Sequence, residues 1–144
     1  MRSTVVQQFL LDNLFTLSIT LISGYMLFWS YFGNRILGVK EADTLQAMNL
    51  INRNDALLVD VREQSEYDSG HIINSKLMPA GKLKERVGEL EKYRERPIIL
   101  VCRSGARATP IASWLGKQGF GQVYLLSGGV LAWQKAKLPL EKKK

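Results

Sequence analysis

The feature that most constrains the fold is a long uncharged stretch near the amino terminus. Between Asp12 and Arg35 the chain runs for 22 residues, from Asn13 to Asn34, without one charged side chain. As an α-helix with a rise of about 1.5 Å per residue, this stretch would reach about 33 Å, and a hydrocarbon core is about 30 Å thick. It therefore predicts a transmembrane helix over residues 13–34, preceded by a short tail over residues 1–12.

Two other interpretations of this stretch are less favoured. A cleaved signal peptide has a basic start and a cleavage site of small residues, whereas here Asp12 precedes the run and Phe28-Trp29-Ser30-Tyr31-Phe32 ends it. A buried core helix could also be apolar, but 22 uncharged residues are long for one. The aromatic residues at the end fit the headgroup region of a bilayer. A single membrane anchor is the favoured interpretation.

The distribution of charge suggests an orientation. Arg2 and Asp12 cancel, so residues 35–144, with a basic tail at Lys142–Lys144, carry the whole net charge of +7. The positive residues that flank the anchor are nearly balanced, but a short tail crosses a membrane more easily than a basic folded domain. A lone cysteine also suits a reducing compartment. We therefore expect a single-pass membrane protein whose globular domain is cytoplasmic.

Composition excludes several classes of protein. An apolar content of 46% excludes a disordered chain. Cys102 and His71 are the only cysteine and histidine in the sequence, so a disulfide framework and a structural zinc site are excluded, and we expect neither a metal nor a cofactor. The positive charges are scattered without an aromatic platform among them, so nucleic acid is not an expected partner.

The globular part alternates short apolar runs with amphipathic stretches. The runs predict buried strands at residues 56–61, 98–101 and 123–126, and the stretches predict helices at residues 42–52, 83–95, 109–118 and 130–136. Residues 35–144 suffice for one domain. Strands that alternate with helices predict an α/β domain in which helices flank a mainly parallel central sheet.

One strand end carries the chemistry. Open α/β sheets bind ligands at the carboxyl ends of their strands, and Cys102 follows a predicted strand and opens a loop that leads into a helix at Thr109. The backbone N–H groups of such a turn and the positive end of the helix favour a thiolate or an anion. A lone cysteine at a strand end is usually an inert core residue, but this position favours a nucleophile. The residues expected to surround its substrate are Arg103, Ser104, Gly105, Ala106 and Arg107.

Three motifs together resemble the signatures of rhodanese-like domains. They are Leu57–Glu63 with Glu66-Tyr67 and Gly70-His71-Ile72, the loop Cys102–Thr109, and Gly128–Trp133 with Leu138-Pro139. They occur in the family's order and fall within a core of residues 39–140. The resemblance implies the rhodanese fold and a sulfurtransferase in which Cys102 carries a sulfane sulfur.

Loop length separates this family from related chemistries. Protein tyrosine phosphatases, and phosphatases that share the rhodanese fold, use Cys-x5-Arg to wrap a tetrahedral phosphate. In this chain the arginine falls at Cys-x4-Arg, from Cys102 to Arg107, and the phosphatase position holds Ala108. The shorter loop is similar to that of rhodaneses, so a phosphatase or an arsenate reductase is the weaker enzyme hypothesis.

The resemblance also implies a mechanism and its partners. Cys102 would take a sulfur from thiosulfate or a low-molecular-weight persulfide and pass it to a thiol, either a small molecule or a protein, or to cyanide. Arg103 and Arg107 would position the anionic donor, and the amides of the loop would stabilise the persulfide. Asp60 and Arg62 are expected to support the loop through hydrogen bonds, with Glu66 paired to Arg62.

A function of another class stays open. The chain could be a non-catalytic rhodanese-like adaptor that docks on a membrane protein complex, because a sulfurtransferase does not need an anchor. The intact Cys102 and its two neighbouring arginines argue against a complete loss of chemistry.

Overall fold

The computed structural model describes residues 2–36 and 39–142, with side chains over residues 4–28 and 39–142. The chain divides into two compact units, residues 1–36 and residues 37–144. Each unit is described by itself.

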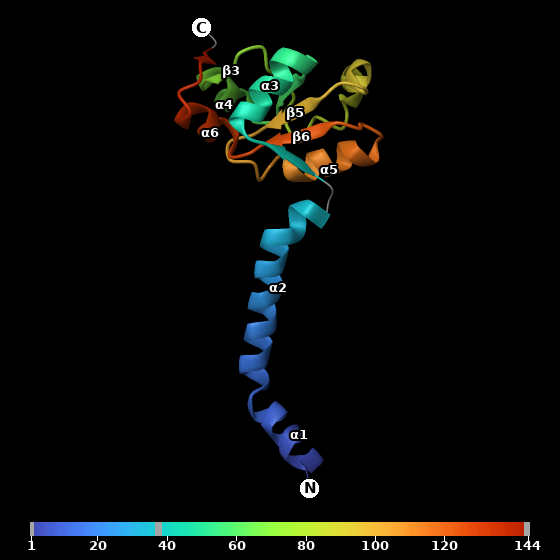
Figure 1. Ribbon diagram of the computed structural model, residues 1–144, viewed down its shortest axis with the longest axis vertical. Coiled ribbons are helices and arrows are strands. Elements are labelled where there is room, and N and C mark those ends of the chain that lie inside the picture. Colours follow the sequence, from blue (N-terminus) through green and yellow to red (C-terminus); the bar gives the residue numbers. More distant parts are fainter. Residues whose placement is uncertain (1, 37–38, 143–144) are drawn as a thin grey trace. The chain divides into compact units, whose positions relative to one another are not determined.

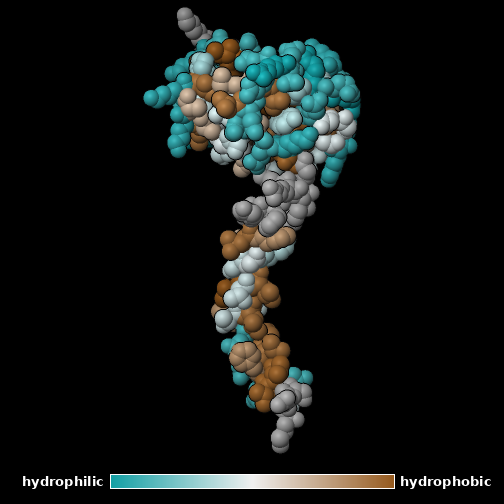
Figure 2. Space-filling model, viewed as in Figure 1, coloured by the Kyte–Doolittle hydropathy of each residue, from teal (hydrophilic) through white to brown (hydrophobic). Residues whose placement is uncertain are grey.

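The amino-terminal unit consists of two helices, α1 (Arg2–Asp12) and α2 (Leu14–Ile36), which Figure 1 shows in blue. The sequence predicted a tail where α1 lies. The helices part at Asn13, whose side-chain amide donates a hydrogen bond to the Phe9 carbonyl at 2.9 Å. Apolar side chains are exposed along both helices, and Figure 2 shows them as brown surface.

The helices of this unit differ from the single transmembrane helix that the sequence predicted. Within the described residues, no single helix is long and apolar enough to cross a bilayer. Thr4–Asp12 and Leu14–Phe28 satisfy length and composition only as a pair, with a bend of 68° between them. The structure therefore gives no support to one straight transmembrane helix over residues 13–34. The side chains of Trp29, Tyr31 and Phe32, predicted at the headgroups, lie outside the described residues.

The second unit is built on a five-stranded sheet in which all pairs are parallel. Its strand order is β1-β6-β5-β2-β4. The strands are β1 (Lys40–Ala42), β2 (Leu57–Asp60), β4 (Lys76–Leu77), β5 (Ile98–Val101) and β6 (Val123–Leu126). A separate antiparallel pair joins β3 (His71–Ile72) to β7 (Leu140–Glu141). The prediction of an α/β domain with a mainly parallel sheet is confirmed.

Helices cover both faces of this sheet, as Figure 1 shows. Side chains of α3 (Thr44–Asn54) and α6 (Gly129–Lys135) share a core with one face, and those of α5 (Thr109–Lys117) and the 3₁₀ helix η1 (Val87–Tyr93) share a core with the other. Strand β5 alternates between the two cores, because successive side chains of a strand point to opposite faces. Ile98 and Leu100 face α5, and Ile99 and Val101 face α3.

The helix predicted over residues 83–95 is the main error in this unit. Residues 80–86 form turns instead, and the helix that follows is 3₁₀ in type. The apolar side chains of this stretch nevertheless share one core, because Leu83 and Leu90 are buried and Val87 and Tyr93 pack against the same cluster. From Val87 onward these residues are spaced by three, which is the repeat of a 3₁₀ helix.

The path of the chain diverges at two neighbouring strands of the sheet, β2 and β5. From β2 the chain leads to β4 on one side, and from β5 it leads to β6 on the other side. Connections that leave neighbouring parallel strands in opposite directions separate at the carboxyl ends, which is where open α/β sheets bind ligands. Asp60 and Val101 lie opposite each other at this point. The segments that follow them are those predicted to carry the chemistry.

Candidate active site

Cys102 lies at the carboxyl end of β5 and continues its alternation. Its side chain belongs to the core on the α5 face, and the residue is only 1% exposed. The Gly105 backbone N–H donates a hydrogen bond to the Cys102 Sγ, with 2.9 Å between nitrogen and sulfur. Gly105 has φ +108°, in the region that favours glycine. The turn therefore folds back so that a backbone donor meets the sulfur.

The first residues of α6 hold the backbone of the loop that begins at Cys102. Val130 N–H donates to the Cys102 carbonyl at 2.9 Å, and Leu131 N–H donates to the Arg103 carbonyl at 3.3 Å. Gly129 makes this close approach possible, because a Cβ atom at that position would lie 2.3 Å from the Cys102 oxygen and 2.5 Å from the Arg103 oxygen. Gly129, which belongs to the motif Gly128–Trp133, thus lets α6 come close enough to hold the backbone of the loop.

Gly129→Ala is expected to destabilise the fold by at least about 2 kcal/mol, because a side chain at φ +58° is strained and the new methyl group would overlap the loop backbone. The substitution should also slow any reaction of Cys102, because the new methyl group would push the loop backbone away from its position around the sulfur. Urea denaturation and thiol alkylation rates would measure the two effects. Gly116→Ala on α5 is the matched control, because a Cβ atom added there would have nothing within 4 Å. Equal stability of the two variants would contradict this account.

Arg107 is bound to a side chain that the sequence assigned elsewhere. Its guanidinium donates to both carboxylate oxygens of Glu66, at 2.8 and 2.9 Å. These hydrogen bonds lower the pKa of Glu66 from 4.5 to about 2 and raise the pKa of Arg107, to which the charge of Cys102 also contributes. The predicted pairing of Glu66 with Arg62 was therefore wrong for its carboxylate, because Arg62 contacts only the Glu66 backbone carbonyl, at 3.2 Å.

The depressed pKa of Glu66 predicts a dependence of stability on pH. Glu66 is more acidic in the folded chain, so its pair with Arg107 stabilises the fold fully above pH 4.5 and loses this contribution as the pH falls towards 2. Both side chains are partly exposed, so the contribution should be below about 1 kcal/mol.

Urea denaturation at several pH values, compared with Glu66→Gln, measures this contribution. The stability difference between the two proteins should be constant from pH 5 to pH 8 and should shrink below about pH 4. Glu85→Gln, at an exposed carboxylate, is the control and should show no such change. A difference that grows on acidification would contradict the assignment.

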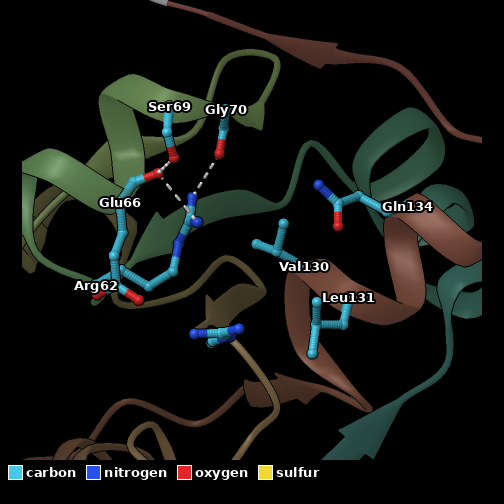
Figure 3. A pocket seen from close by; sticks show the side chains of 8 residues that line it. Arg62, Glu66, Ser69, Gly70, Val130, Leu131 and Gln134 are labelled. Carbon is cyan, nitrogen blue, oxygen red and sulfur yellow. Dashed lines mark hydrogen bonds between the residues drawn. The ribbon is translucent and has the colours of Figure 1, made fainter.

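Asp60 and Arg62 form a buried ion pair beside the loop. Asp60 is 0% and Arg62 5% exposed. The guanidinium donates to both Asp60 carboxylate oxygens at 2.7 to 3.0 Å, and the Arg62 backbone N–H donates to the same carboxylate at 3.0 Å. Arg62 also donates to the Gly70 carbonyl at 2.9 Å (Figure 3). The pair therefore fixes α4 (Gln64–Ser69) and the turn after it, whereas the described contacts show no hydrogen bond from it to the Cys102 loop.

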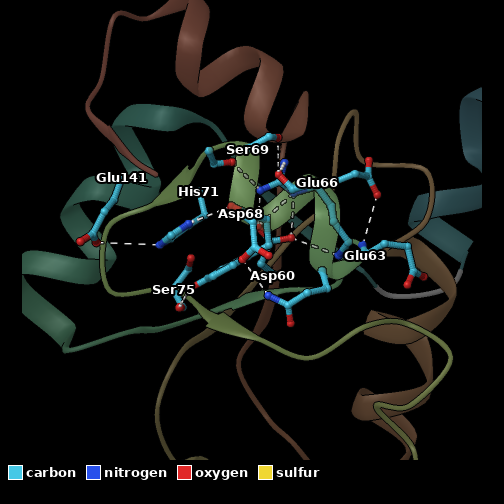
Figure 4. Close-up of polar contacts among 12 residues, drawn as sticks. Asp60, Glu63, Glu66, Asp68, Ser69, His71, Ser75 and Glu141 are labelled. Carbon is cyan, nitrogen blue, oxygen red and sulfur yellow. Dashed lines mark hydrogen bonds and ion pairs between the residues drawn. The ribbon is translucent and has the colours of Figure 1, made fainter. Parts of the chain in front are cut away.

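His71 has contacts that hold it in the fold. His71 is buried, stacks on Tyr67 with ring centroids 3.7 Å apart, and has its Nδ1 2.9 Å from the Tyr67 carbonyl. Figure 4 shows His71 between α4 and Glu141, whose carboxylate lies 3.8 Å from Nε2. The backbone and Tyr67 therefore account for the contacts of the His71 ring. Within the described part of the chain, no cluster of His, Cys, Asp or Glu could hold a metal ion.

A cavity of about 300 Å³ opens beside the loop, between α4 and α6 (Figure 3). It is lined by Arg62, Glu66, Ser69, Gly70, Arg103, Val130, Leu131 and Gln134. Of the predicted site residues, Arg62 and Arg103 meet here, while Arg107 is held by Glu66. Sequence reasoning gave no site role to the other lining residues, among them Ser69, Leu131 and Gln134. Leu131 and Gln134 are three residues apart on one helix, and this spacing was the available signal.

Comparisons with known proteins agree with this architecture. The sequence model of the rhodanese-like domain family matches residues 43–136. Uncharacterized protein YibN from Escherichia coli K12 is 41% identical over 71% of this chain and 72% of its own length. Thiosulfate sulfurtransferase GlpE from Pseudoalteromonas translucida is 32% identical over 69% of this chain and 93% of its own. The crystal structure of a rhodanese-like domain protein from Staphylococcus aureus superimposes with a TM-score of 0.65 at 25% identity, covering 74% of this chain and all of that one.

Proposed function

The chain belongs to the rhodanese-like domain family, and from this premise we propose that it is a sulfurtransferase that carries a sulfane sulfur on Cys102. The observation that carries the proposal is the hydrogen bond from Gly105 N–H to the Cys102 Sγ, inside a loop of the Cys-x4-Arg length. A backbone donor aimed at a sulfur stabilises negative charge on it. Relatives named thiosulfate sulfurtransferase support the same chemistry.

The proposed reaction with thiosulfate is a nucleophilic displacement at sulfur. The Cys102 thiolate attacks the outer sulfur of thiosulfate, a bond forms between the two sulfurs, and the sulfur–sulfur bond of thiosulfate breaks. The bonding electron pair leaves with sulfite, and Cys102 becomes a persulfide. Sulfite leaves as a stable anion, so the step needs no general acid. His71 is therefore not needed as an acid, which agrees with its position: its ring is stacked on Tyr67 and bonded to a backbone carbonyl.

Arg103 and Arg107 take different parts in this proposal. The Arg103 side chain is exposed and forms no hydrogen bond or ion pair with a described residue, so its charge is available to an anionic donor. Arg107 is held by Glu66 and adds positive charge to the loop from a fixed position. Because Cys102 is almost fully buried, access of the donor requires the largely exposed segment Arg103–Ala106 to move outward.

The test uses the full chain, purified in a mild detergent and treated with thiosulfate. Cys102 should gain the mass of one sulfur atom, with release of one sulfite per chain. Cyanide should then remove that sulfur as thiocyanate. The same protein should not hydrolyse p-nitrophenyl phosphate, because its loop is one residue shorter than that of the phosphatases. A chain that stays unmodified by thiosulfate and by glutathione persulfide would refute the proposal.

We also propose that residues 13–34 attach the domain to a membrane, with the domain on the cytoplasmic side. The support is the uncharged stretch and the exposed apolar side chains of α1 and α2, among them Phe9, Phe15 and Leu21. The bent pair of helices reaches the required length and composition only together. The chain should resist extraction from membranes by alkaline carbonate, and protease should cleave the domain only in inverted vesicles. Complete extraction by carbonate would contradict the anchor.

A docking function is the second candidate, and the same apolar helices favour it, because sulfur transfer does not use them. In this case the domain would be a non-catalytic adaptor on a membrane protein complex. One stoichiometric membrane partner should then co-purify equally with the wild-type chain and with Cys102→Ser. Persulfide formation at a useful rate without such a partner would favour the enzyme.

A further inference from the structure

The cavity between α4 and α6 contains two polar side chains that the fold leaves without partners. Arg62 is neutralised by Asp60, and the Glu66 carboxylate is neutralised by Arg107. By contrast, the side chains of Arg103 and Gln134 form no hydrogen bond or ion pair with any described residue, and both residues line the cavity. One uncompensated positive charge and one amide therefore remain for a ligand.

The walls of the cavity complement this polar pair. Val130 and Leu131 present aliphatic surface between the loop and Gln134, and Figure 3 shows these side chains on α6 opposite α4. The backbone N–H groups of the same two residues are bonded to the carbonyls of Cys102 and Arg103. A molecule seated on this wall would therefore lie next to the segment that carries the reactive sulfur.

We infer that this cavity binds the sulfur acceptor, and that the acceptor is a small thiol bearing a carboxylate. The inference rests on the proposed function. Arg103 would bind the carboxylate, Gln134 would hydrogen-bond to it or to a neighbouring amide, and Val130 and Leu131 would contact the carbon chain. The volume of about 300 Å³ is at the lower end for ligand sites, which suits a molecule the size of an amino acid or a short peptide. An uncharged or cationic thiol leaves Arg103 unpaired.

The transfer step balances without a further reactant. The acceptor thiolate attacks the terminal sulfur of the protonated Cys102 persulfide and forms a new sulfur–sulfur bond. The bond between the terminal sulfur and Sγ breaks, and its electron pair returns to Sγ. The products are a free persulfide of the acceptor and the Cys102 thiolate, which Gly105 N–H can stabilise again.

The test measures single-turnover reaction of the full chain, loaded beforehand with sulfur on Cys102. Mercaptoacetate and mercaptoacetamide are the two acceptors, since they differ by one charge at nearly constant size. Rates are corrected for the thiolate fraction of each acceptor. The wild-type chain should prefer mercaptoacetate by about 10-fold, the value of one charge-assisted hydrogen bond.

Three variants locate the source of this preference. Arg103→Gln should reduce the preference to within about twofold, and Gln134→Ala should lower it at least about threefold. Lys135→Gln is the matched control, because it removes a positive charge from α6 at an exposed residue outside the cavity. This variant should keep the preference for mercaptoacetate. Raising the ionic strength should affect Lys135→Gln and the wild type alike.

The outcomes separate this inference from the proposed function. If the persulfide forms but the four proteins share one ratio of rates, the acceptor site is refuted and the sulfurtransferase stands. If Lys135→Gln lowers the preference as much as Arg103→Gln, a diffuse positive field explains it and the site is refuted. Reaction with a protein thiol such as thioredoxin alone, and with neither small thiol, also refutes it. Absence of any persulfide on Cys102 refutes the proposed function itself.

Discussion

Cys102→Ser is expected to abolish sulfur transfer from thiosulfate to cyanide, with a loss of at least about 1,000-fold in kcat/KM. The serine oxygen can still accept the hydrogen bond that Gly105 N–H donates to sulfur in the wild-type chain. It cannot form a persulfide, however, and Cys102 is the only cysteine in the chain. The fold should remain intact, because serine is close to cysteine in size and the loop backbone is held by α6.

The measurement combines thiocyanate production with mass spectrometry of the intact chain. Serine places a hydroxyl in a mostly apolar setting, so Cys102→Ala serves as a second variant that introduces no polar group. Both should keep the near-ultraviolet circular dichroism of the wild type and show no added sulfur. Turnover by either variant at more than a few per cent of the wild-type rate would mean that the sulfur travels by a route without Cys102.

Arg62→Met is expected to lower the free energy of unfolding by about 3 to 5 kcal/mol, the largest stability change that we foresee. The substitution keeps an unbranched side chain of similar length but leaves the Asp60 carboxylate, which is 0% exposed, with one backbone N–H donor. The Gly70 carbonyl also loses its donor. A buried charge without compensation is the cause of the destabilisation.

Urea denaturation of the full chain at neutral pH measures this change. Arg53→Met is the matched control, because Arg53 is exposed on α3, and it should change stability by less than about 0.5 kcal/mol. The double variant Asp60→Asn with Arg62→Met removes both charges and should be more stable than Arg62→Met alone. A double variant that is less stable than Arg62→Met would show that the hydrogen bonds of the pair, and not its charges, determine the effect.

The central part of the fold could be predicted from the sequence because its strands are continuous apolar runs. Such runs predict burial on both faces, and β2, β5 and β6 lie within or at the predicted ranges. The helices α3, α5 and α6 follow from their apolar spacing to within two residues. The loop after β5 was predicted for the same reason, since a buried strand that ends in Cys102 must deliver it to the edge of the sheet.

The remaining parts depend on contacts that periodicity does not encode. Strands β3, β4 and β7 have two residues each, which is too short to show a repeat. The ion pair between Arg107 and Glu66 joins residues 41 positions apart, so the nearer Arg62 was the obvious but wrong partner. Arg62 was already committed to Asp60, two residues away, and only the buried geometry shows this.

The attachment of the loop to α6 through main-chain atoms has a consequence for how such a protein can diversify. The two hydrogen bonds that hold the loop use the carbonyls of Cys102 and Arg103, and the donor to sulfur is the amide of Gly105. None of these bonds depends on the side chain at position 103, 104 or 106, and those side chains are exposed. Selection can therefore vary them to suit a new donor or acceptor while the sulfur keeps its location.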